Sequence, residues 1–212
     1  MADTHAYRFV LLRHGESEGN VQGVHQGQAD FPLTPRGRAQ ARQLAEAWAA
    51  RGVTFRTIFS SPLARAAETA RIVAEVLGIE QIVFDPIWKE RDKGQLTGLP
   101  FGANVPGSSP TSLFYPVGTT GESLWEVHRR ATEAVQRLLE NPPGQYLVVS
   151  HGGFMNLVIH AMLGIAPQPY PHAPSFRLPN TAYIAMEYRP ATHRWLVLGL
   201  CHRSSEAAFP CV

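Results

Sequence analysis

Short apolar runs that end on polar residues restrict most strongly how this chain of 212 residues can fold. The first run, 7–12 (YRFVLL), leads directly into Arg13 and His14, and a later run, 146–150 (YLVVS), leads into His151. Continuous apolar runs of this length are typical of strands that are buried on both faces of a parallel sheet. The residues that follow such strands lie at one edge of the sheet, where open α/β sheets bind their ligands.

Segments with helical periodicity lie between these runs. Thr34 with Pro35 predicts a helix start, and Ser61 with Pro62 predicts the same kind of start, which places Arg65 in the first turn of a second helix. Further strands are expected at 57–60, 81–84, 181–188 and 195–200, and further helices at 124–138 and 153–163. This alternation predicts a three-layer α/β/α sandwich with a mainly parallel central sheet.

The stretch from Gly94 to Gly121 is rich in glycine, proline and serine and interrupts the alternation. We expect it to form a small cap or lid loop inserted into one domain that spans 1–212, because a chain of this length buries one substantial core. The sequence leaves open whether the apolar residues of this loop line the mouth of a site or pack onto the core: Leu96, Leu99, Phe101, Leu113, Phe114 and Tyr115.

Charge and composition exclude several classes of protein. The net charge is +2, and the basic residues are scattered, so no nucleic-acid partner is indicated. No apolar run approaches the roughly 18 to 20 residues of a membrane span, and the start of the chain carries no apolar leader, so we expect a cytoplasmic protein with no membrane partner. Cys201 and Cys211 form neither a disulfide framework nor a metal-binding pair and are interpreted as inert thiols.

Two arginines and two histidines are expected to meet at the strand ends, namely Arg13, Arg65, His14 and His151. Guanidinium groups match the shape and charge of a phosphoryl group. Two buried arginines at one place would repel each other unless an anion lies between them. The sequence therefore predicts a pocket for a dianion.

Several motifs show a resemblance to a known family that spans nearly the whole chain. Residues 12–17 (LRHGES) resemble the signature, with its RHG core, of the histidine phosphatase superfamily, which includes the cofactor-dependent phosphoglycerate mutases. Other segments are similar to further motifs of that family: LTPRG at 33–37, SSPLARA at 60–66, ERDKG at 90–94, SHGG at 150–153 and LPNT at 178–181.

The resemblance implies a mechanism in which His14 is the nucleophile and becomes phosphorylated. It implies that Glu90 is the proton donor and that His151 is a further catalytic residue which holds phosphate oxygens. The remaining contacts that it implies come from Arg13, Arg65, Asn20 and Gly152 for the phosphate, and from Gln26 and Gly27 for the rest of the substrate.

The chemistry of such a site places demands on these residues. His14 must be neutral to attack phosphorus, and the charges of Arg13 and Arg65 disfavour its protonation. Its second ring nitrogen is expected to donate to a backbone carbonyl, which holds the ring in the orientation needed for in-line attack on phosphorus. Glu90 would protonate the leaving oxygen and then activate the attacking water. Fixed cations meet the phosphoryl charge, so neither a metal ion nor another cofactor is expected.

These observations favour a histidine acid phosphatase-type phosphomonoesterase that acts on small phosphorylated metabolites. Phosphotransfer of the phosphoglycerate mutase type is the alternative. The glycolytic mutases carry a longer, more basic insertion and an ERHYG acid motif, whereas 94–121 holds no Lys or Arg. A non-catalytic protein that binds a phosphorylated ligand is a remoter alternative, and a homodimer is left open.

Two other hydrolase classes are disfavoured. Residues 15–19 fit the GxSxG motif of α/β-hydrolases with Ser17 as nucleophile, but only one strand precedes Ser17. A zinc hydrolase would carry HExxH, which is absent, and arginines beside the ligands would repel the metal ion. The other histidines are individually interpreted as surface or structural residues: His5, His25, His128, His160, His172, His193 and His202.

Overall fold

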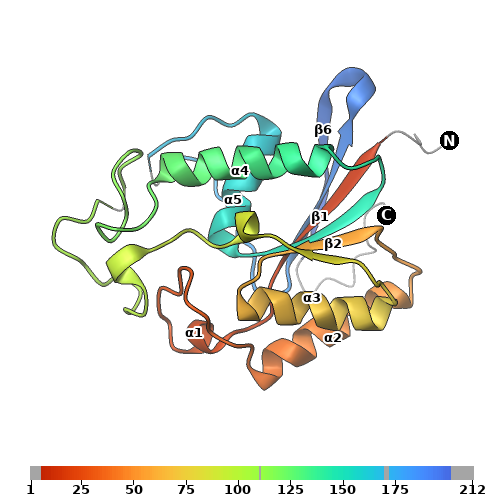
Figure 1. Ribbon diagram of the computed structural model, residues 1–212, viewed down its shortest axis with the longest axis horizontal. Coiled ribbons are helices and arrows are strands. Elements are labelled where there is room, and N and C mark those ends of the chain that lie inside the picture. Colours follow the sequence, from red (N-terminus) through yellow and green to blue (C-terminus); the bar gives the residue numbers. More distant parts are fainter. Residues whose placement is uncertain (1–5, 110, 170–171, 202–212) are drawn as a thin grey trace.

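A six-stranded sheet with the order β3-β2-β4-β1-β5-β6 runs through the centre of the molecule (Figure 1). The computed structural model describes residues 6–109, 111–169 and 172–201. Its strands are β1 (Tyr7–Arg13), β2 (Thr57–Ser60), β3 (Ile82–Phe84), β4 (Gln145–Ser150), β5 (Tyr183–Arg189) and β6 (Arg194–Cys201). The first four strands pair in parallel, and β5 and β6 add an antiparallel edge. The predicted, mainly parallel sheet is confirmed.

Helices cover both faces of this sheet. The longer ones are α2 (Pro35–Ala49), α3 (Ala64–Leu77), α4 (Leu124–Leu139) and α5 (Gly152–Leu163). Helices α2 and α3 pack on one face, and α4 and α5 pack on the other (Figure 1). The three-layer sandwich that the alternation predicted is therefore present.

The alternation of side chains along β1 explains why both faces need a cover. Phe9 and Leu11 belong to the core under α4 and α5, whereas Val10 and Leu12 belong to the core under α2 and α3. All four are buried. Successive residues of a strand point to opposite faces, so an unbroken apolar run makes a strand that is stable only between two layers of helices.

One predicted helix start is confirmed and one is wrong. Helix α2 begins as expected, with Pro35 at its first position and the Thr34 hydroxyl accepting the N–H of Gly37 at 3.0 Å. Helix α3 begins at Ala64 instead of directly after Ser61. Its cap comes from a distant loop, because Asp30 Oδ1 accepts the Ala64 N–H at 2.8 Å. Ser61 lies before the helix and is used in the site described below.

Several short elements were not predicted. They are α1 (Glu18–Val21) and the 3-10 turns η1 (Pro86–Trp88), η2 (Gly94–Leu96) and η3 (Pro190–Thr192). Strand β5 starts two residues later than expected, because Thr181 adopts a left-handed conformation with φ of 59°. Cys201 is buried at the end of β6, and Cys211 lies outside the described residues. Within the described ranges no helix has the length and apolar character to cross a membrane.

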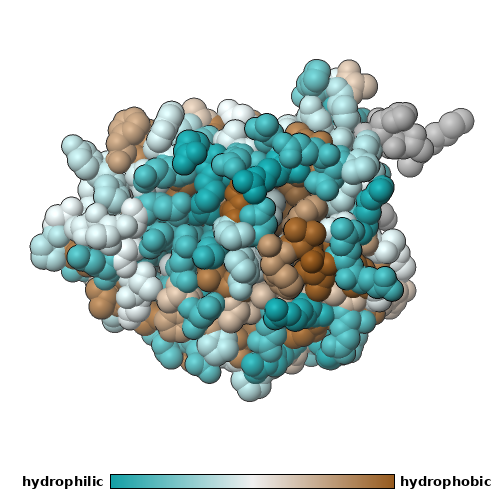
Figure 2. Space-filling model, in the orientation of Figure 1, coloured by the Kyte–Doolittle hydropathy of each residue, from teal (hydrophilic) through white to brown (hydrophobic). Residues whose placement is uncertain are grey.

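The loop 94–121 projects from the sandwich beyond the start of α4 (Figure 1). It holds a small apolar cluster of its own, made by Leu96, Val105 and Val117. The N–H of His25 donates to Leu99 O and the N–H of Gly98 donates to His25 O, both at 2.8 Å, which ties the loop to the segment after α1. On the face seen in Figure 2, hydrophilic side chains predominate and apolar ones form smaller patches.

Candidate active site

The ends of the central strands open into a cavity of about 430 Å³. Its wall includes Arg13 and His14 from the end of β1, Arg65 from the start of α3, Glu90 from the segment after β3 and Gly152 from the start of α5. These segments meet because β1 and β2 both pair in parallel with β4. The structure thus brings together the residues that the sequence placed at the strand ends.

His14 is held rigidly at the floor of this cavity, with only 3% of its surface exposed. Its Nδ1 lies 2.6 Å from Gly15 O. Because a carbonyl can only accept, Nδ1 carries the proton and Nε2 presents its lone pair. Burial, and after it the charges of Arg65 and Arg13, hold the pKa of His14 well below its usual range. The expected carbonyl contact is present, and the imidazole is neutral near pH 7.

The LPNT segment braces the loop that carries this nucleophile. Asn180 Nδ2 donates to His14 O and Gly15 O, both at 3.1 Å. The N–H of Thr181 donates to Arg13 O, also at 3.1 Å. A motif near the end of the chain therefore fixes the backbone of a motif near its start.

Gly15 is required by a close approach between two motifs. A Cβ at this position would stand 2.5 Å from Gly37 O, in the LTPRG segment. No side chain fits there without moving the backbone at the start of α2. The N–H of Gly15 also donates to Thr69 Oγ1 at 3.1 Å, which anchors the nucleophile loop to α3.

Arg65 is fully enclosed and bonded on several sides. Its Nη1 donates to Ala29 O and its Nη2 to Gly27 O, both at 2.8 Å, and its Nε donates to His151 Nδ1 at 3.2 Å. Burial lowers the pKa of Arg65 to about 10, so the guanidinium stays charged at neutral pH. Its exposure is 1%, so these contacts fix its orientation before any ligand binds.

Arg13 differs from Arg65 in how much of its guanidinium is used. Its Nη1 donates to Leu178 O at 2.7 Å, while its Nε is buried with no hydrogen-bond partner among the described residues. An orphaned buried donor costs free energy unless a ligand satisfies it. Gly152 lies beside this group, since a Cβ there would be 3.5 Å from Arg13 Nε. The geometry fits an anion bound between Arg13 and the start of α5.

His151 lies next to the nucleophile, with a ring centroid 5.2 Å from that of His14. Its Nδ1 accepts from Arg65, so its Nε2 carries the proton and donates to Ser61 Oγ at 2.8 Å. Burial, then the charge of Arg65, lowers the pKa of His151 well below its usual range. Both ring nitrogens are thus used inside the protein, and a direct bond to phosphate would require one of these contacts to break.

The Glu90 carboxyl group lies over the start of α5. Its Oε1 accepts the N–H groups of Arg91 and Phe154, both at 2.8 Å, and its Oε2 accepts that of Gly153 at 3.0 Å. A Cβ at Gly153 would stand 2.7 Å from Oε1, so this position must be glycine for the carboxyl to fit. The helix start holds the expected proton donor in the cavity wall.

The remaining predicted contacts also lie in the wall, but their oxygens are used within the protein. Asn20 Oδ1 accepts from Ser17 and from Asn180 Nδ2, and Gln26 Oε1 accepts the Ser17 hydroxyl at 2.8 Å. Gly27 lines the cavity and binds Arg65 through its carbonyl. Ser17 is fully buried and caps α1, which contradicts the nucleophile that an esterase would need.

Some residues of the wall were missed by sequence reasoning. They are Val24, His25, Lys93, Asn156, Phe176, Arg177 and Leu178. Phe101 also lines the wall, which is one of the two uses that the sequence left open for the apolar residues of the loop. Lys93 and Arg177 form no ion pair with another described residue, and burial lowers the pKa of Lys93. Lys93 lies inside the ERDKG motif, and Arg177 directly precedes LPNT, so both motifs carried the signal.

Two features of this wall add to what the sequence predicted. The loop 94–121 supplies no cation, but Lys93 and Arg177, which lie outside it, add two to the cavity wall. His25, predicted to be a surface or structural residue, is partly exposed in this wall and contacts Phe101 edge-on, with 5.0 Å between the ring centroids. His5 and His202 lie outside the described residues. Nowhere in the described part do three His, Cys, Asp or Glu side chains gather closely enough to hold a metal ion.

Curated relatives and a family model match nearly the whole chain. The model of the histidine phosphatase superfamily (branch 1) matches residues 9–200. The probable phosphoglycerate mutase GpmB of Yersinia enterocolitica is 34% identical over 197 residues, which cover 89% of this chain and 87% of that protein. The protein of the same description from an Enterobacter species is 33% identical over 196 residues, with the same shares covered.

Solved structures with this fold include several phosphatases. A phosphoserine phosphatase mutant from Entamoeba histolytica in complex with phosphoserine has a TM-score of 0.77 and 26% identity, covering 93% of this chain and 98% of that chain. A mycobacterial glucosyl-3-phosphoglycerate phosphatase has a TM-score of 0.75 and 26% identity, and the match covers 91% of this chain and 97% of that chain. A putative alpha-ribazole-5'-P phosphatase from Escherichia coli has a TM-score of 0.79 and 27% identity, covering 93% and 97%. With a buried histidine held between two arginines at the strand ends, this chain belongs to the histidine phosphatase superfamily.

Proposed function

We propose that this protein is a phosphomonoester hydrolase that acts through a phosphohistidine at His14 on small phosphorylated metabolites. The observation that carries this proposal is the state of His14, a neutral imidazole with its lone pair at Nε2 between two guanidinium groups. A neutral nucleophile beside fixed cations suits attack on a dianion better than any other reaction considered. The phosphatases among the similar structures support the same reading.

In the first half-reaction, Nε2 of His14 attacks phosphorus and the bond between phosphorus and the ester oxygen breaks. Arg13 and Arg65 balance the charge of the equatorial oxygens, and Gly152, which lines the same cavity, would add a further bond through its backbone N–H. Glu90 gives its proton to the leaving oxygen. We assign this proton to Oε2, because Oε1 already accepts two N–H groups whereas Oε2 accepts one.

In the second half-reaction, the Glu90 carboxylate takes a proton from water, and the water oxygen bonds to phosphorus as the bond between phosphorus and His14 Nε2 breaks and its electron pair returns to that nitrogen. Inorganic phosphate leaves, and both His14 and Glu90 return to their initial states. Since side-chain cations meet the phosphoryl charge throughout, this cycle needs no metal ion. His151 contributes by holding Arg65, and direct contact with phosphate is a further role that the resemblance implies.

Phosphotransfer of the mutase type is the second candidate. It is favoured by Lys93 and Arg177, which form no ion pair with another described residue and line the same cavity as Arg13 and Arg65. It is also favoured by the relatives that carry a mutase description. With Glu90 protonated as the donor, the four cations leave a formal charge of about +4, and a phosphoryl dianion reduces this to about +2, so a carboxylate on the substrate would lower it further.

Release of inorganic phosphate separates the two candidates. The protein is incubated with 3-phosphoglycerate in the presence of a chelator, and free phosphate and 2-phosphoglycerate are measured together. We expect phosphate release to dominate and a quenched reaction to contain an acid-labile, base-stable phosphate on the protein. Fast interconversion with negligible release would replace the hydrolase by the mutase, and turnover without a phosphoprotein would remove the covalent mechanism.

A further inference from the structure

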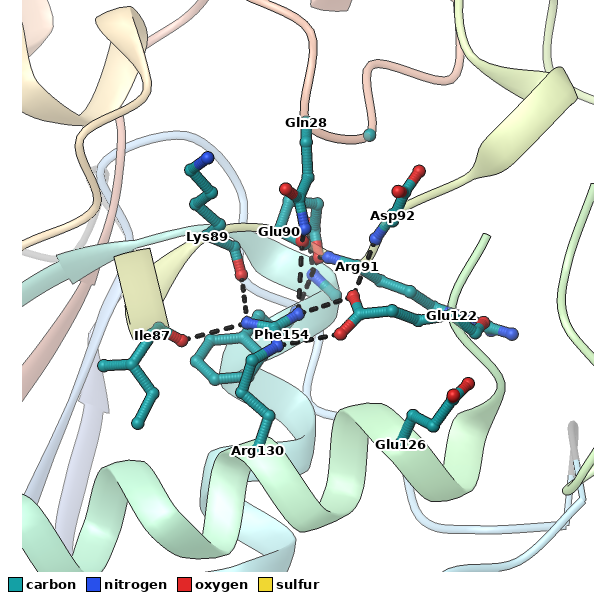
Figure 3. Close-up of polar contacts among 12 residues, drawn as sticks. Gln28, Ile87, Lys89, Glu90, Arg91, Asp92, Glu122, Glu126, Arg130 and Phe154 are labelled. Atoms are coloured by element: carbon teal, nitrogen blue, oxygen red, sulfur yellow. Dashed lines mark hydrogen bonds and ion pairs between the residues drawn. The ribbon is translucent and has the colours of Figure 1, made fainter. Parts of the chain in front are cut away.

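Arg130 on α4 lies outside the cavity wall, yet most of its donors point at the segment that carries Glu90 (Figure 3). Its Nη1 donates to Ile87 O at 2.9 Å and to Lys89 O at 2.7 Å, and its Nη2 donates to Glu90 O at 3.3 Å. One planar group thus gathers three carbonyls of a four-residue stretch. A guanidinium is the side chain that can do this, because its donors have a fixed, divergent geometry.

Glu122 holds Arg130 in this position. Its Oε1 accepts Arg130 Nε at 2.9 Å and its Oε2 accepts Arg130 Nη2 at 2.7 Å, which is a two-bonded ion pair. The exposures of the two side chains are 16% and 22%, so solvent screens the pair only partly. Glu122 Oε2 also accepts the N–H of Asp92 at 2.8 Å, and Glu122 O accepts from Arg91 Nε at 2.9 Å. Glu122 therefore holds Arg91 and Asp92, the two residues that follow Glu90.

The same guanidinium also stacks on α5. Its central carbon lies 4.1 Å from the ring centroid of Phe154. The N–H of Phe154 is one of the donors that hold the Glu90 carboxyl. The backbone of Glu90 and the helix turn that receives its side chain are therefore fixed against one group, as the close-up in Figure 3 shows.

We propose that Arg130, aligned by Glu122, is a positioning residue for proton transfer by Glu90. This inference rests on the proposed function, in which Glu90 protonates the leaving oxygen. The carbonyl of Glu90 has one further donor, Gln28 Nε2 at 3.1 Å. The stretch before it is fixed at Trp88, whose carbonyl accepts the Ser150 hydroxyl at 2.7 Å, so Arg130 acts on the part between this anchor and Glu90. Without Arg130 the carboxyl would remain in the cavity but would lose its fixed distance to the substrate oxygen.

The test uses two phosphate esters that differ in their need for an acid. Glycerol 2-phosphate releases an alkoxide, which must be protonated, whereas 4-nitrophenyl phosphate releases a stable anion. Because kcat/KM covers only the steps up to phosphorylation of His14, the ratio of kcat/KM between the two esters reports proton donation. Substitution of a residue with a purely structural role would lower kcat/KM for both esters by the same factor.

We expect Glu90→Gln to lower kcat/KM for glycerol 2-phosphate by about 10²-fold or more and that for 4-nitrophenyl phosphate by less than about tenfold. Arg130→Gln is expected to shift the ratio in the same direction by about tenfold, and Arg130→Lys, which keeps the charge but not the planar fork, by a smaller factor. Arg129→Gln, at the exposed neighbouring position on α4, is the matched control and leaves the ratio unchanged.

In the double variant with Glu90→Gln, the change Arg130→Gln should no longer alter the ratio, since no proton donor is left to position. An equal loss for both esters, or an additional shift in the double variant, would overturn the positioning role and leave the proposed function intact. A Glu90→Gln variant with no dependence on the leaving group would overturn both. If Arg130→Gln does not fold, as judged by circular dichroism, Arg130→Lys and Glu122→Gln carry the same test.

Discussion

The floor of the cavity and the loop 94–121 above it are built in opposite ways. On the floor, His14, Arg65 and His151 are at most 3% exposed, and hydrogen bonds fix the orientation of each side chain. In the loop, Phe114 and Tyr115 are 68% and 70% exposed. The floor is organised before a substrate arrives, which suits chemistry, whereas the outer part of the loop leaves large side chains exposed to solvent, although its backbone is hydrogen-bonded internally. Changes to the floor should therefore alter turnover, and changes to the loop should alter at most substrate choice.

The loop does not behave as one unit, however. Leu96 packs into the small cluster with Val105 and Val117, while Phe101 lines the cavity and is 62% exposed. Phe101 thus shows the first use that the sequence left open, whereas Leu96 packs within the loop itself and not onto the main core. Phe114 serves neither, since it contacts Trp125 at 5.8 Å on the outside. Only the part of the loop near Phe101 is expected to affect substrates.

The largest effect is expected from the centre of the floor. His14→Ala removes the nucleophile, and we expect kcat to fall on the order of 10⁴-fold or more, while circular dichroism shows a folded protein. His172→Ala, at an exposed histidine, is the control and should leave kcat unchanged. Undiminished turnover in His14→Ala would show that the buried imidazole is not the reacting group.

Substitutions of the two arginines, Arg13 and Arg65, should have similar effects on activity but different effects on stability. We expect Arg13→Gln and Arg65→Gln each to lower kcat/KM by about 10²- to 10³-fold. Arg65 also makes three internal hydrogen bonds, whereas Arg13 makes one. Arg65→Gln should therefore lower the melting temperature by several degrees, and Arg13→Gln should lower it less. Equal melting temperatures would mean that the internal bonds of Arg65 do not stabilise the fold.

Lys93 lies directly before the loop 94–121 and lines the cavity, so its substitution tests whether the cavity binds a second anionic group. If it binds a second anionic group, Lys93→Gln should raise KM for 3-phosphoglycerate by about tenfold, the loss of one charged hydrogen bond. The KM for 4-nitrophenyl phosphate, which has no such group, is the internal control and should stay the same. A similar rise for both substrates would place Lys93 among the groups that bind the phosphate itself.

Acid should lower the stability of the folded protein through the two histidines of the floor. The pKa values of His14 and His151 are lowered in the folded protein, so the unfolded chain binds more protons below their usual value of 6.5. Stability then falls as the pH drops through that value, because protons favour the unfolded state. We expect the melting temperature to fall by roughly 2 °C or more between about pH 7 and pH 5. The decrease should be smaller in His14→Gln than in the control His172→Gln, and an unchanged decrease would contradict the assigned state of His14.

The smallest effect is expected at the outside of the loop. Tyr115→Ala should change the free energy of unfolding by no more than about 0.5 kcal/mol, since an exposed side chain away from special contacts contributes little. Both kcat and KM should also stay close to their original values. Phe101→Ala, in the cavity wall, is the matched comparison and should raise KM for 4-nitrophenyl phosphate several-fold. Equal effects of the two changes would show that the outer loop also reaches the substrate.

Much of the fold and part of the site were predictable from the chain alone. Buried parallel strands leave an unbroken apolar run, and their carboxyl ends must meet, so Arg13, His14 and His151 could be placed together without coordinates. Thr34 and Pro35 marked their helix correctly, because that cap is local. The cap of α3 was missed because Asp30 reaches Ala64 from another loop. Local signals were predictable, and contacts between distant segments were not.

The sequence by itself determined the layers of the sandwich, the family and the group of arginine and histidine residues that meets at the strand ends, since these depend on periodicity and on short contiguous motifs. Only the tertiary structure decided that His151 is bonded to Arg65 and Ser61, that Lys93 faces the phosphate site, and that Arg130 supports Glu90. Each of these depends on atoms brought within hydrogen-bond reach or into one cavity from separate segments. Such distances follow from how the layers pack, and a motif such as ERDKG marks a segment near the site without fixing which atoms in it come into contact.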